Sequence, residues 1–245
     1  MTEEKSRVLE ISYTGKLKES NKVFDTTQES VARQEGRYRE GITYEPVVVV
    51  TGANHVIPGL DRALSEMREG EERELTIEAR DGFGERDPKK VVITPLQEFR
   101  KRNINPYPGM VIEADNSYAK VQSVSGGRVR LDFNNELAGK TLLYSVKVEK
   151  EYASREEKAK ALFKRAFPYA KLSGQKFEFT GGEVTIELSR DVSEKQAVQL
   201  SKKMYTEEAK AFAGIESVKF VESFSQGARE ENGKPGPKKA RKKSE

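Results

Sequence analysis

The sequence predicts an α+β protein with more than one folded unit. The chain has 245 residues, more than one average domain requires. Short strand-like runs bounded by glycine and proline dominate the first 150 residues, including a distinct segment at 88–133. Residues 154–226 instead follow the order α-β-β-α-β. Strands and helices grouped in this way along the chain are typical of α+β folds.

Four strand-like runs lie in the N-terminal 150 residues outside the segment 88–133. Each alternates apolar and polar side chains or is a short β-branched run, and glycine or proline lies beside most of them. They are residues 7–14, 47–50, 72–78 and 142–149. We expect four strands, of which 47–50 is buried and 142–149 is half-buried.

One short helix is predicted between the second and third of these strands. Pro58-Gly59 precedes residues 60–67, and Gly70 follows them. The apolar side chains keep the i, i+3, i+4, i+7 spacing of one helix face. They are Leu60, Ala63, Leu64 and Met67.

Residues 88–133 form a β-rich segment of their own. A helical run at 95–102 follows the strand-like residues 91–94, and Ser125-Gly126-Gly127 is a hairpin signal. The remaining strand candidates are residues 110–114, 117–124 and 128–133. The larger apolar side chains of the segment include Leu96, Phe99, Ile104, Met110 and Tyr118. Because so short a segment has little else to bury, part of this set must form its own core.

The pattern changes at Ser154, which opens a capping box with Glu157 and a helix. One face of that helix carries Ala159, Leu162, Phe163, Ala166 and Phe167. Alternating residues on either side of Gly181-Gly182 predict a hairpin. A second capping box at 193–196 is expected to open a helix that carries Ala197, Leu200 and Met204. A last strand is predicted on Val218, Phe220 and Phe224, which completes an independent α+β domain.

The composition excludes several kinds of chemistry. The chain has no cysteine and one histidine, so disulfides, thiolate nucleophiles and Cys/His zinc sites are excluded. A Ser-His-Asp triad would have to use His55, which we expect to be an ordinary loop histidine. No apolar run approaches the ~20 residues that a bilayer span needs, and no signal-peptide core follows residues 1–7. We expect a soluble cytoplasmic protein without metal, cofactor or membrane contact.

The excess positive charge resides in the C-terminal tail. The chain has 44 basic and 40 acidic residues, a formal net charge of +4. Seven basic and three acidic residues lie between Gln226 and Glu245, which leaves 37 of each sign before them. We expect residues 227–245 to be disordered, because proline, glycine and lysine have nothing to bury. Such a tail either aids solubility or contacts the phosphates of ribosomal or other nucleic acid.

Five short motifs follow one another along residues 12–142. They are Ser12-Tyr13-Thr14-Gly15, Val23-Phe24-Asp25-Thr26-Thr27, the run 55–64 (HVIPGLDRAL), Asp81-Gly82-Phe83-Gly84, and the run 134–142 (NNELAGKTL). Together they resemble the FKBP-type peptidyl-prolyl isomerases. The fifth resembles the N-H-x-L-A-G-K-x-L signature at which SlyD-like members re-enter the fold after an inserted flap domain. The resemblance covers residues 6–152 by motif. Residues 154–226 are similar to the long archaeal form by architecture alone.

The resemblance implies a domain arrangement. An antiparallel sheet wrapped on a short helix would comprise residues 1–87 and 134–153. The inserted flap domain, with chaperone activity, would be 88–133. An extra α-β-β-α-β domain would follow at 154–226, before the basic tail at 227–245. The implied partners are unfolded or proline-containing polypeptides, and the oligomeric state stays open.

The resemblance also implies the site. The catalytic set would be Tyr13, Phe24, Asp25, Ile57, Phe83 and Tyr144. Substrate would also contact Val47, Val56, Leu60 and Leu137 in the isomerase part and Leu96, Phe99, Met110 and Tyr118 in the insert. Asp25 should bond to the Tyr13 hydroxyl, and the backbone N–H of Ile57 should hold a substrate carbonyl. Rotation about an X–Pro bond breaks no covalent bond, so an apolar cleft without nucleophile or metal suits this reaction.

Two positions depart from the family pattern. Leu60 replaces the tryptophan at the pocket floor of the best-known members, and Phe83 replaces a tyrosine and so lacks a hydroxyl donor. The leading hypothesis is an isomerase that also acts as a chaperone. One alternative is a holdase chaperone with a weakened isomerase site, and another is a folding factor associated with ribosomes or RNA.

Overall fold

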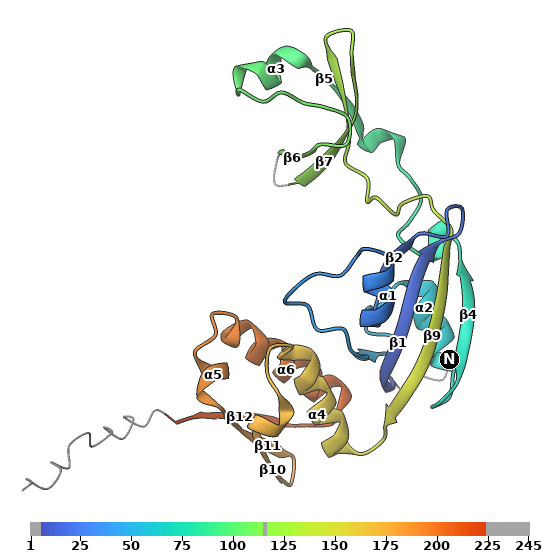
Figure 1. Cartoon of the computed structure of the whole chain (residues 1–245). Helices are drawn as coiled ribbons and strands as arrows, with labels where there is room; N and C mark the ends of the chain where they lie inside the picture. Colours follow the sequence, from blue (N-terminus) through green and yellow to red (C-terminus); the bar gives the residue numbers. More distant parts are fainter. Residues whose placement is uncertain (1–5, 115–116, 224–245) are drawn as a thin grey trace, which may run out of the picture.

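The computed structural model describes residues 6–114 and 117–223 (Figure 1). Its strands form three separate sheets of five, four and three strands, which confirms the α+β class. In Figure 1 the four-stranded sheet lies at one end, the three-stranded sheet at the other, and the five-stranded sheet between them. Within the described ranges, no helix is both long and apolar enough to cross a bilayer.

The five-stranded sheet is antiparallel and is organised around its first strand. Its members are β1 (Val8–Leu17), β2 (Val23–Thr26), β3 (Val47–Val50), β4 (Glu72–Ile77) and β9 (Leu142–Tyr152). β1 pairs with β9 on one side, and on the other side with β3 at its start and β2 near its end. β4 completes the sheet beside β9. All four strands predicted in this part of the chain are therefore present.

Two helices accompany this sheet, α1 (Glu29–Gln34) and α2 (Pro58–Glu66). The predicted helix is α2, which begins at Pro58 and buries Leu60 and Leu64 against the sheet. A Cβ on Gly59 would lie 2.7 Å from Ile77 Cγ2, so the glycine allows α2 to pack this closely against β4. The sequence patterns did not predict α1, whose single buried residue, Ala32, gives a helix face too short to detect.

The insert forms its own antiparallel sheet in the order β5-β8-β7-β6. Its elements are β5 (Val91–Pro95), α3 (Leu96–Lys101), β6 (Val111–Ala114), β7 (Ser117–Ser125) and β8 (Arg128–Asp132), preceded by the 3₁₀ turns η1 (Ala79–Asp81) and η2 (Pro88–Lys90). The predicted strands, short helix and hairpin at Gly126-Gly127 are confirmed. Six buried residues form a small separate core: Phe99, Ile112, Ala119, Val121, Val129 and Leu131.

Asn134 joins the two chain segments that lead into and out of the insert. Its side-chain oxygen accepts from the Asp87 N–H at 2.9 Å, and its side-chain nitrogen donates to the Asp87 carbonyl at 2.9 Å. The Asp132 carboxylate accepts from the backbone and side chain of Asn134 and pairs with Arg86. The carbonyl of Gly84 accepts from the Gly139 N–H at 2.8 Å. The insert therefore leaves and re-enters the five-stranded sheet at neighbouring points.

The C-terminal part places two helices against a three-stranded sheet. It comprises α4 (Arg155–Ala166), η3 (Leu172–Gly174), β10 (Lys176–Thr180), β11 (Glu183–Leu188), α5 (Arg190–Ser193), α6 (Val198–Phe212) and β12 (Ser217–Glu222). β10 and β11 form the predicted hairpin, and β12 pairs with β11 in parallel. The capping box of Ser154 and Glu157 is present. The apolar face of α4 is buried as predicted.

The second predicted capping box is wrong. Ser193 ends the helical turn α5, and its hydroxyl donates to the Arg190 carbonyl rather than capping a new helix. α6 begins at Val198, and its buried face carries Val198, Ser201, Tyr205 and Ala209. Leu200, one of the apolar residues expected along this helix, is 62% exposed. The helix packs on the core through the neighbouring face, one residue further along the chain, and Leu200 lies outside that face.

The core of the C-terminal part continues into the five-stranded sheet. Val8, Val48 and Val50 belong to the same apolar cluster as the buried faces of α4 and α6. Lys164 donates to the Glu10 carboxylate at 2.8 Å, and Tyr152 donates to the same carboxylate at 2.9 Å. His55 also lies at this junction with its side chain only 8% exposed. It is therefore not the ordinary loop histidine that the sequence suggested.

Two sequence predictions lie outside the described residues. Phe224, assigned to the last strand, follows the described end of the chain, and so does the basic tail at 227–245.

We predict that Asn134→Ala lowers the free energy of unfolding by about 1–3 kcal/mol, because it leaves polar groups at the junction without partners. Urea denaturation of the full chain measures this. Asn135→Ala is the comparison variant, since the Asn135 side chain accepts only from the Leu137 N–H nearby. Equal destabilisation by both variants would show that Asn134 has no special role at the junction.

Candidate active site

Four aromatic side chains from different elements meet on one face of the five-stranded sheet. Tyr13 comes from β1, Phe24 from β2, Tyr144 from β9, and Phe83 from the loop after η1. The Phe24 ring lies edge-on to Phe83 and Tyr144, with centroids 6.2 and 5.7 Å away. The Tyr13 and Tyr144 centroids are 5.8 Å apart. Edge-on and tilted contacts are the favoured geometry for aromatic pairs, so the cluster is well packed.

Gly15 makes room for Phe24 in this cluster. In the sheet, Gly15 lies between Asp25 of β2 and Tyr144 of β9. A Cβ at position 15 would lie 2.6 Å from the Phe24 ring. Any larger residue would push the ring out of place. The glycine of the first sequence motif therefore has a direct packing role.

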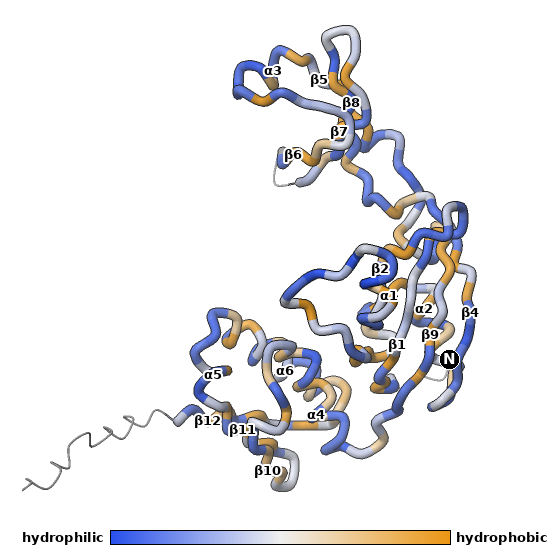
Figure 2. Tube along the Cα trace, viewed as in Figure 1, coloured by the Kyte–Doolittle hydropathy of each residue, from blue (hydrophilic) through white to orange (hydrophobic). Residues whose placement is uncertain are grey.

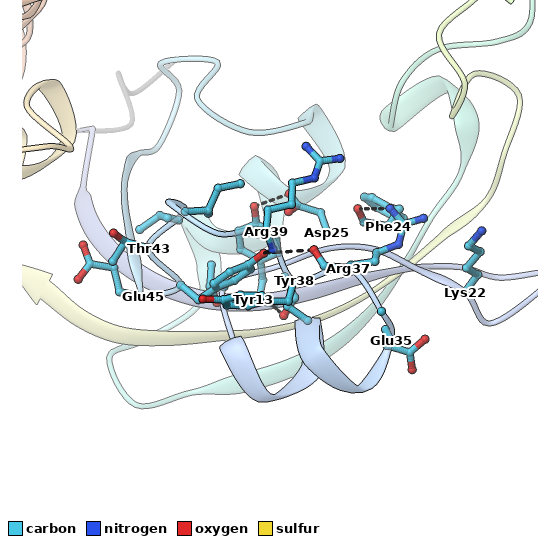
Figure 3. A pocket seen from close by; sticks show the side chains of 17 residues that line it. Tyr13, Lys22, Phe24, Asp25, Glu35, Arg37, Tyr38, Arg39, Thr43 and Glu45 are labelled. Atoms are coloured by element: carbon cyan, nitrogen blue, oxygen red, sulfur yellow. Dashed lines mark hydrogen bonds between the residues drawn. The ribbon is translucent and has the colours of Figure 1, made fainter. Parts of the chain in front are cut away.

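Tyr13 and Asp25 form the hydrogen bond that the sequence resemblance implied. The Tyr13 hydroxyl donates to the Asp25 carboxylate over 2.7 Å (Figure 3). Burial and this hydrogen bond raise the pKa of the Tyr13 phenol above its usual range. Burial likewise raises the pKa of Tyr144. Both phenols are therefore neutral hydrogen-bond donors at physiological pH.

A pocket of about 580 Å³ opens beside this cluster (Figure 3). Four of the residues that the resemblance assigned to the site line it: Tyr13, Phe24, Asp25 and Val47. The loop between α1 and β3 supplies most of the other lining residues, among them Arg37, Tyr38, Arg39, Ile42, Thr43 and Tyr44. The sequence analysis missed this loop because it has no periodic pattern. Its one signal was the clustering of two tyrosines with three arginines at 33–44.

Stacked side chains hold this loop over the pocket. The Arg33 guanidinium lies 3.6 Å from the centre of the Tyr38 ring, and Tyr38 stacks on Tyr44 with centroids 5.7 Å apart. The Tyr44 hydroxyl donates to the Arg37 carbonyl and accepts from the Arg39 N–H. These contacts fix the loop, so it forms a defined wall of the pocket.

The structure places the other predicted cleft residues at different depths. Val56 and Ile57 pack on the apolar cluster beneath the aromatic residues. Leu60 is 2% exposed within that cluster, so it presents almost no surface to a substrate, which corrects its assignment. Ile57 is the N-cap of α2, with an extended backbone. Val47 is 38% exposed at the pocket rim. Leu137 is half-buried in the turn after the insert and lies outside the three apolar clusters.

The predicted binding residues of the insert differ in exposure, and some of them are core residues. Phe99 is 7% exposed and belongs to the insert's core, with Leu96 and Met110 packed against it. Phe99 therefore presents almost no surface to a ligand, which corrects its assignment. Tyr118 is 69% exposed on β7. Sequence alone could not separate these roles because both kinds of residue are apolar.

This arrangement suits a reaction that changes the conformation of its substrate and breaks no covalent bond. A prolyl amide loses its resonance and much of its charge separation as it twists, so apolar walls favour the twisted form over the planar one. Aromatic rings and neutral phenols provide such walls. Within the described residues, no group of three His, Asp or Glu side chains could hold a metal ion.

Comparison with known protein families agrees with this geometry. The family model of FKBP-type peptidyl-prolyl cis-trans isomerases matches residues 2–106. A short-type peptidyl-prolyl cis-trans isomerase of Methanocaldococcus jannaschii is 37% identical over 132 residues, 54% of this chain and 84% of that protein. The chain belongs to the FKBP-type peptidyl-prolyl cis-trans isomerase family. It is an enzyme of that class.

More specific similarities define the branch of the family. The model of the FKBP26 IF domain matches residues 92–137, and that of the FKBP26 C-terminal region matches residues 155–225. A probable FKBP-type 16 kDa isomerase of Pseudomonas fluorescens is 30% identical over 42% of this chain and 71% of its own length. SlyD of Helicobacter pylori is 31% identical over 44% of this chain and 60% of its own. The SlyD-like resemblance is thus confirmed, whereas an archaeal origin stays a prediction.

The raised pKa of Tyr13 predicts a loss of stability at alkaline pH. An unfolded tyrosine loses its proton near pH ~10, but the folded chain keeps this phenol protonated. Stability from this residue is therefore fully present below about pH 10 and declines as the pH rises further. Urea denaturation between about pH 8 and 11 should show that Tyr13→Phe declines less steeply than wild type.

Tyr118→Phe removes an exposed phenol of the insert and serves as the control. It should decline as wild type does. Identical slopes for Tyr13→Phe and wild type would contradict a raised pKa for Tyr13 in the folded chain.

Proposed function

We propose that this isomerase acts on prolines in unfolded polypeptides and that its inserted sheet holds those polypeptides as a chaperone. The observation that carries the proposal is the exposed apolar surface of the insert. Val92 and Ile93 on β5, Val111 on β6 and Tyr118 on β7 are between 44% and 69% exposed. Figure 2 shows these strands far from the C-terminal part.

The strand order supports binding along the sheet edges. β5 and β6 are the outer strands of the insert's sheet, so each has one edge without a partner strand among the described residues. An unpaired edge offers N–H and C=O groups to an extended chain, and exposed apolar side chains beside it add affinity. Such binding needs little sequence specificity, which suits an unfolded client.

In the cleft, we propose that the prolyl ring contacts Tyr13, Phe24 and Phe83, and that the backbone N–H of Ile57 holds a substrate carbonyl. Tyr144 is 5% exposed and supports the Phe24 ring from behind. The aromatic packing and the extended backbone of Ile57 support these roles. Asp25 orients the Tyr13 hydroxyl through their hydrogen bond. A client held on the insert has its prolines at high effective concentration near this cleft.

Replacing residues 89–133 by a short turn tests the division of labour. The excision should leave a folded protein, because the two junction segments lie together at Asn134. Activity on a proline tetrapeptide should stay near normal. Catalysis of the proline-limited refolding of an unfolded protein should fall at least about tenfold, or ~1.4 kcal/mol of lost binding.

A point variant tests the same surface without removing it. Ile93→Ser with Val111→Ser should reproduce the loss on the protein substrate and spare the tetrapeptide. Leu200→Ser, which changes an equally exposed apolar residue on α6, should affect neither assay. Equal loss on both substrates after excision would make the insert a structural part of the cleft and end the chaperone proposal.

Phe83→Tyr tests whether the missing hydroxyl limits catalysis. Phe83 lies at the cleft, edge-on to Phe24, where a phenol could donate to a substrate carbonyl. We expect tetrapeptide kcat/KM to rise by about two- to tenfold, the range of one net hydrogen bond. No gain would show that the hydroxyl is dispensable in this chain.

A further inference from the structure

His55 occupies a buried position between the isomerase part and helix α6. Its Nδ1 accepts a hydrogen bond from the backbone N–H of Val50 at 3.1 Å. Its Nε2 lies 3.4 Å from Oε1 of Glu208 on α6. The ring also meets Phe212 edge-on. One imidazole therefore bridges the end of β3 and the C-terminal part.

These contacts select one form of the imidazole. A backbone N–H can only donate, so Nδ1 must carry a lone pair rather than a proton. The proton of the neutral ring then resides on Nε2, which faces the Glu208 carboxylate. The partner of one ring nitrogen commonly fixes the proton on the other in this way.

The carboxylate of Glu208 is placed to accept a hydrogen bond from His55 Nε2–H. Its Oε1 also accepts from Arg165 Nε at 3.1 Å, and its Oε2 is buried with no hydrogen-bond partner among the described residues. Burial opposes ionisation, but the hydrogen bond with His55 and the charge of Arg165 hold the pKa of Glu208 below its usual range. The carboxylate is therefore charged at neutral pH.

The segment that His55 fixes leads directly into the cleft. Val56 and Ile57 follow it in the chain and pack on the apolar cluster of the site. Asp61 of α2 accepts from the Gly52 N–H at 3.0 Å, which anchors the start of the same turn. Asn54, between the two anchors, has a left-handed backbone with φ of 56°. The turn is thus held at both ends, and His55 is the anchor next to the cleft.

We propose that His55 is a positioning residue of the isomerase and that Glu208, in the C-terminal part, acts through it. Glu208 keeps the proton on Nε2, which leaves Nδ1 free to hold the Val50 N–H and so sets the position of Val56 and Ile57. The C-terminal part then contributes to catalysis without touching the substrate.

A double-mutant cycle in the full-length chain tests the proposal. Glu208→Ala should lower tetrapeptide kcat/KM by about three- to tenfold, the size of one net hydrogen bond. His55→Asn should keep most of the activity, because an amide oxygen can accept from the Val50 N–H without choosing a tautomer. Adding Glu208→Ala to His55→Asn should then cost nothing further. Glu207→Ala, an exposed neighbour on α6, is the unchanged control.

A spectroscopic measurement separates positioning from general destabilisation. The chain has a single histidine, so ¹⁵N NMR of the untagged protein reports the tautomer of His55 directly. Wild type should show the Nε2–H form, and Glu208→Ala a mixture of both tautomers. The proposal is overturned if wild type shows the Nδ1–H form. It also fails if Glu208→Ala reduces activity equally in the wild-type chain and in the His55→Asn variant.

Discussion

The rest of the molecule depends on the antiparallel pairing of β1 with β9, because this pairing joins residues 8–17 to residues 142–152. Its register runs from Val8 opposite Tyr152 to Leu17 opposite Leu142. Side chains alternate between the two faces of a sheet, so a slip of one residue between these strands would put Tyr13 and Tyr144 on opposite faces. β9 also pairs with β4, which leaves the whole insert as an excursion between two neighbouring strands. The entropic cost of closing a chain segment between two paired strands grows slowly with its length, so the fold can accommodate a second sheet between β4 and β9.

The same two strands connect the isomerase sheet to the C-terminal part. β9 runs into α4 through the Ser154 cap, and the start of β1 supplies Val8 to the core beneath α4. Glu10 of β1 accepts from both Lys164 and Tyr152, which fixes the helix to the sheet by polar contacts as well. A shared core of this kind couples the two parts mechanically. It gives a physical basis for a contact such as His55 with Glu208 to matter at the cleft.

Most regular elements could be predicted because their side chains keep a period. The alternating residues of β9 and the apolar face of α4 are examples, and both are buried as expected. Aperiodic features could not be predicted in this way. The loop from Arg37 to Tyr44 forms a wall of the pocket through a stack on Arg33, which no local pattern indicates. The start of α6 was misplaced because Ser193 resembles a cap in sequence but ends a preceding turn in the fold.

The sequence by itself determined the family, through short motifs, and which chemistry the composition excludes. The absence of cysteine rules out thiolate nucleophiles and disulfides, and the motifs include Tyr13, Phe24 and Asp25, whose side chains line the pocket in the structure. Only the tertiary structure decided which apolar residues of the insert are core, as Phe99 is, and which are exposed, as Tyr118 is. It alone brought His55 to Glu208, since those residues are more than 150 positions apart in the chain. Burial and long-range contacts arise from the packing of whole elements, and a local sequence pattern carries no information about its distant neighbours.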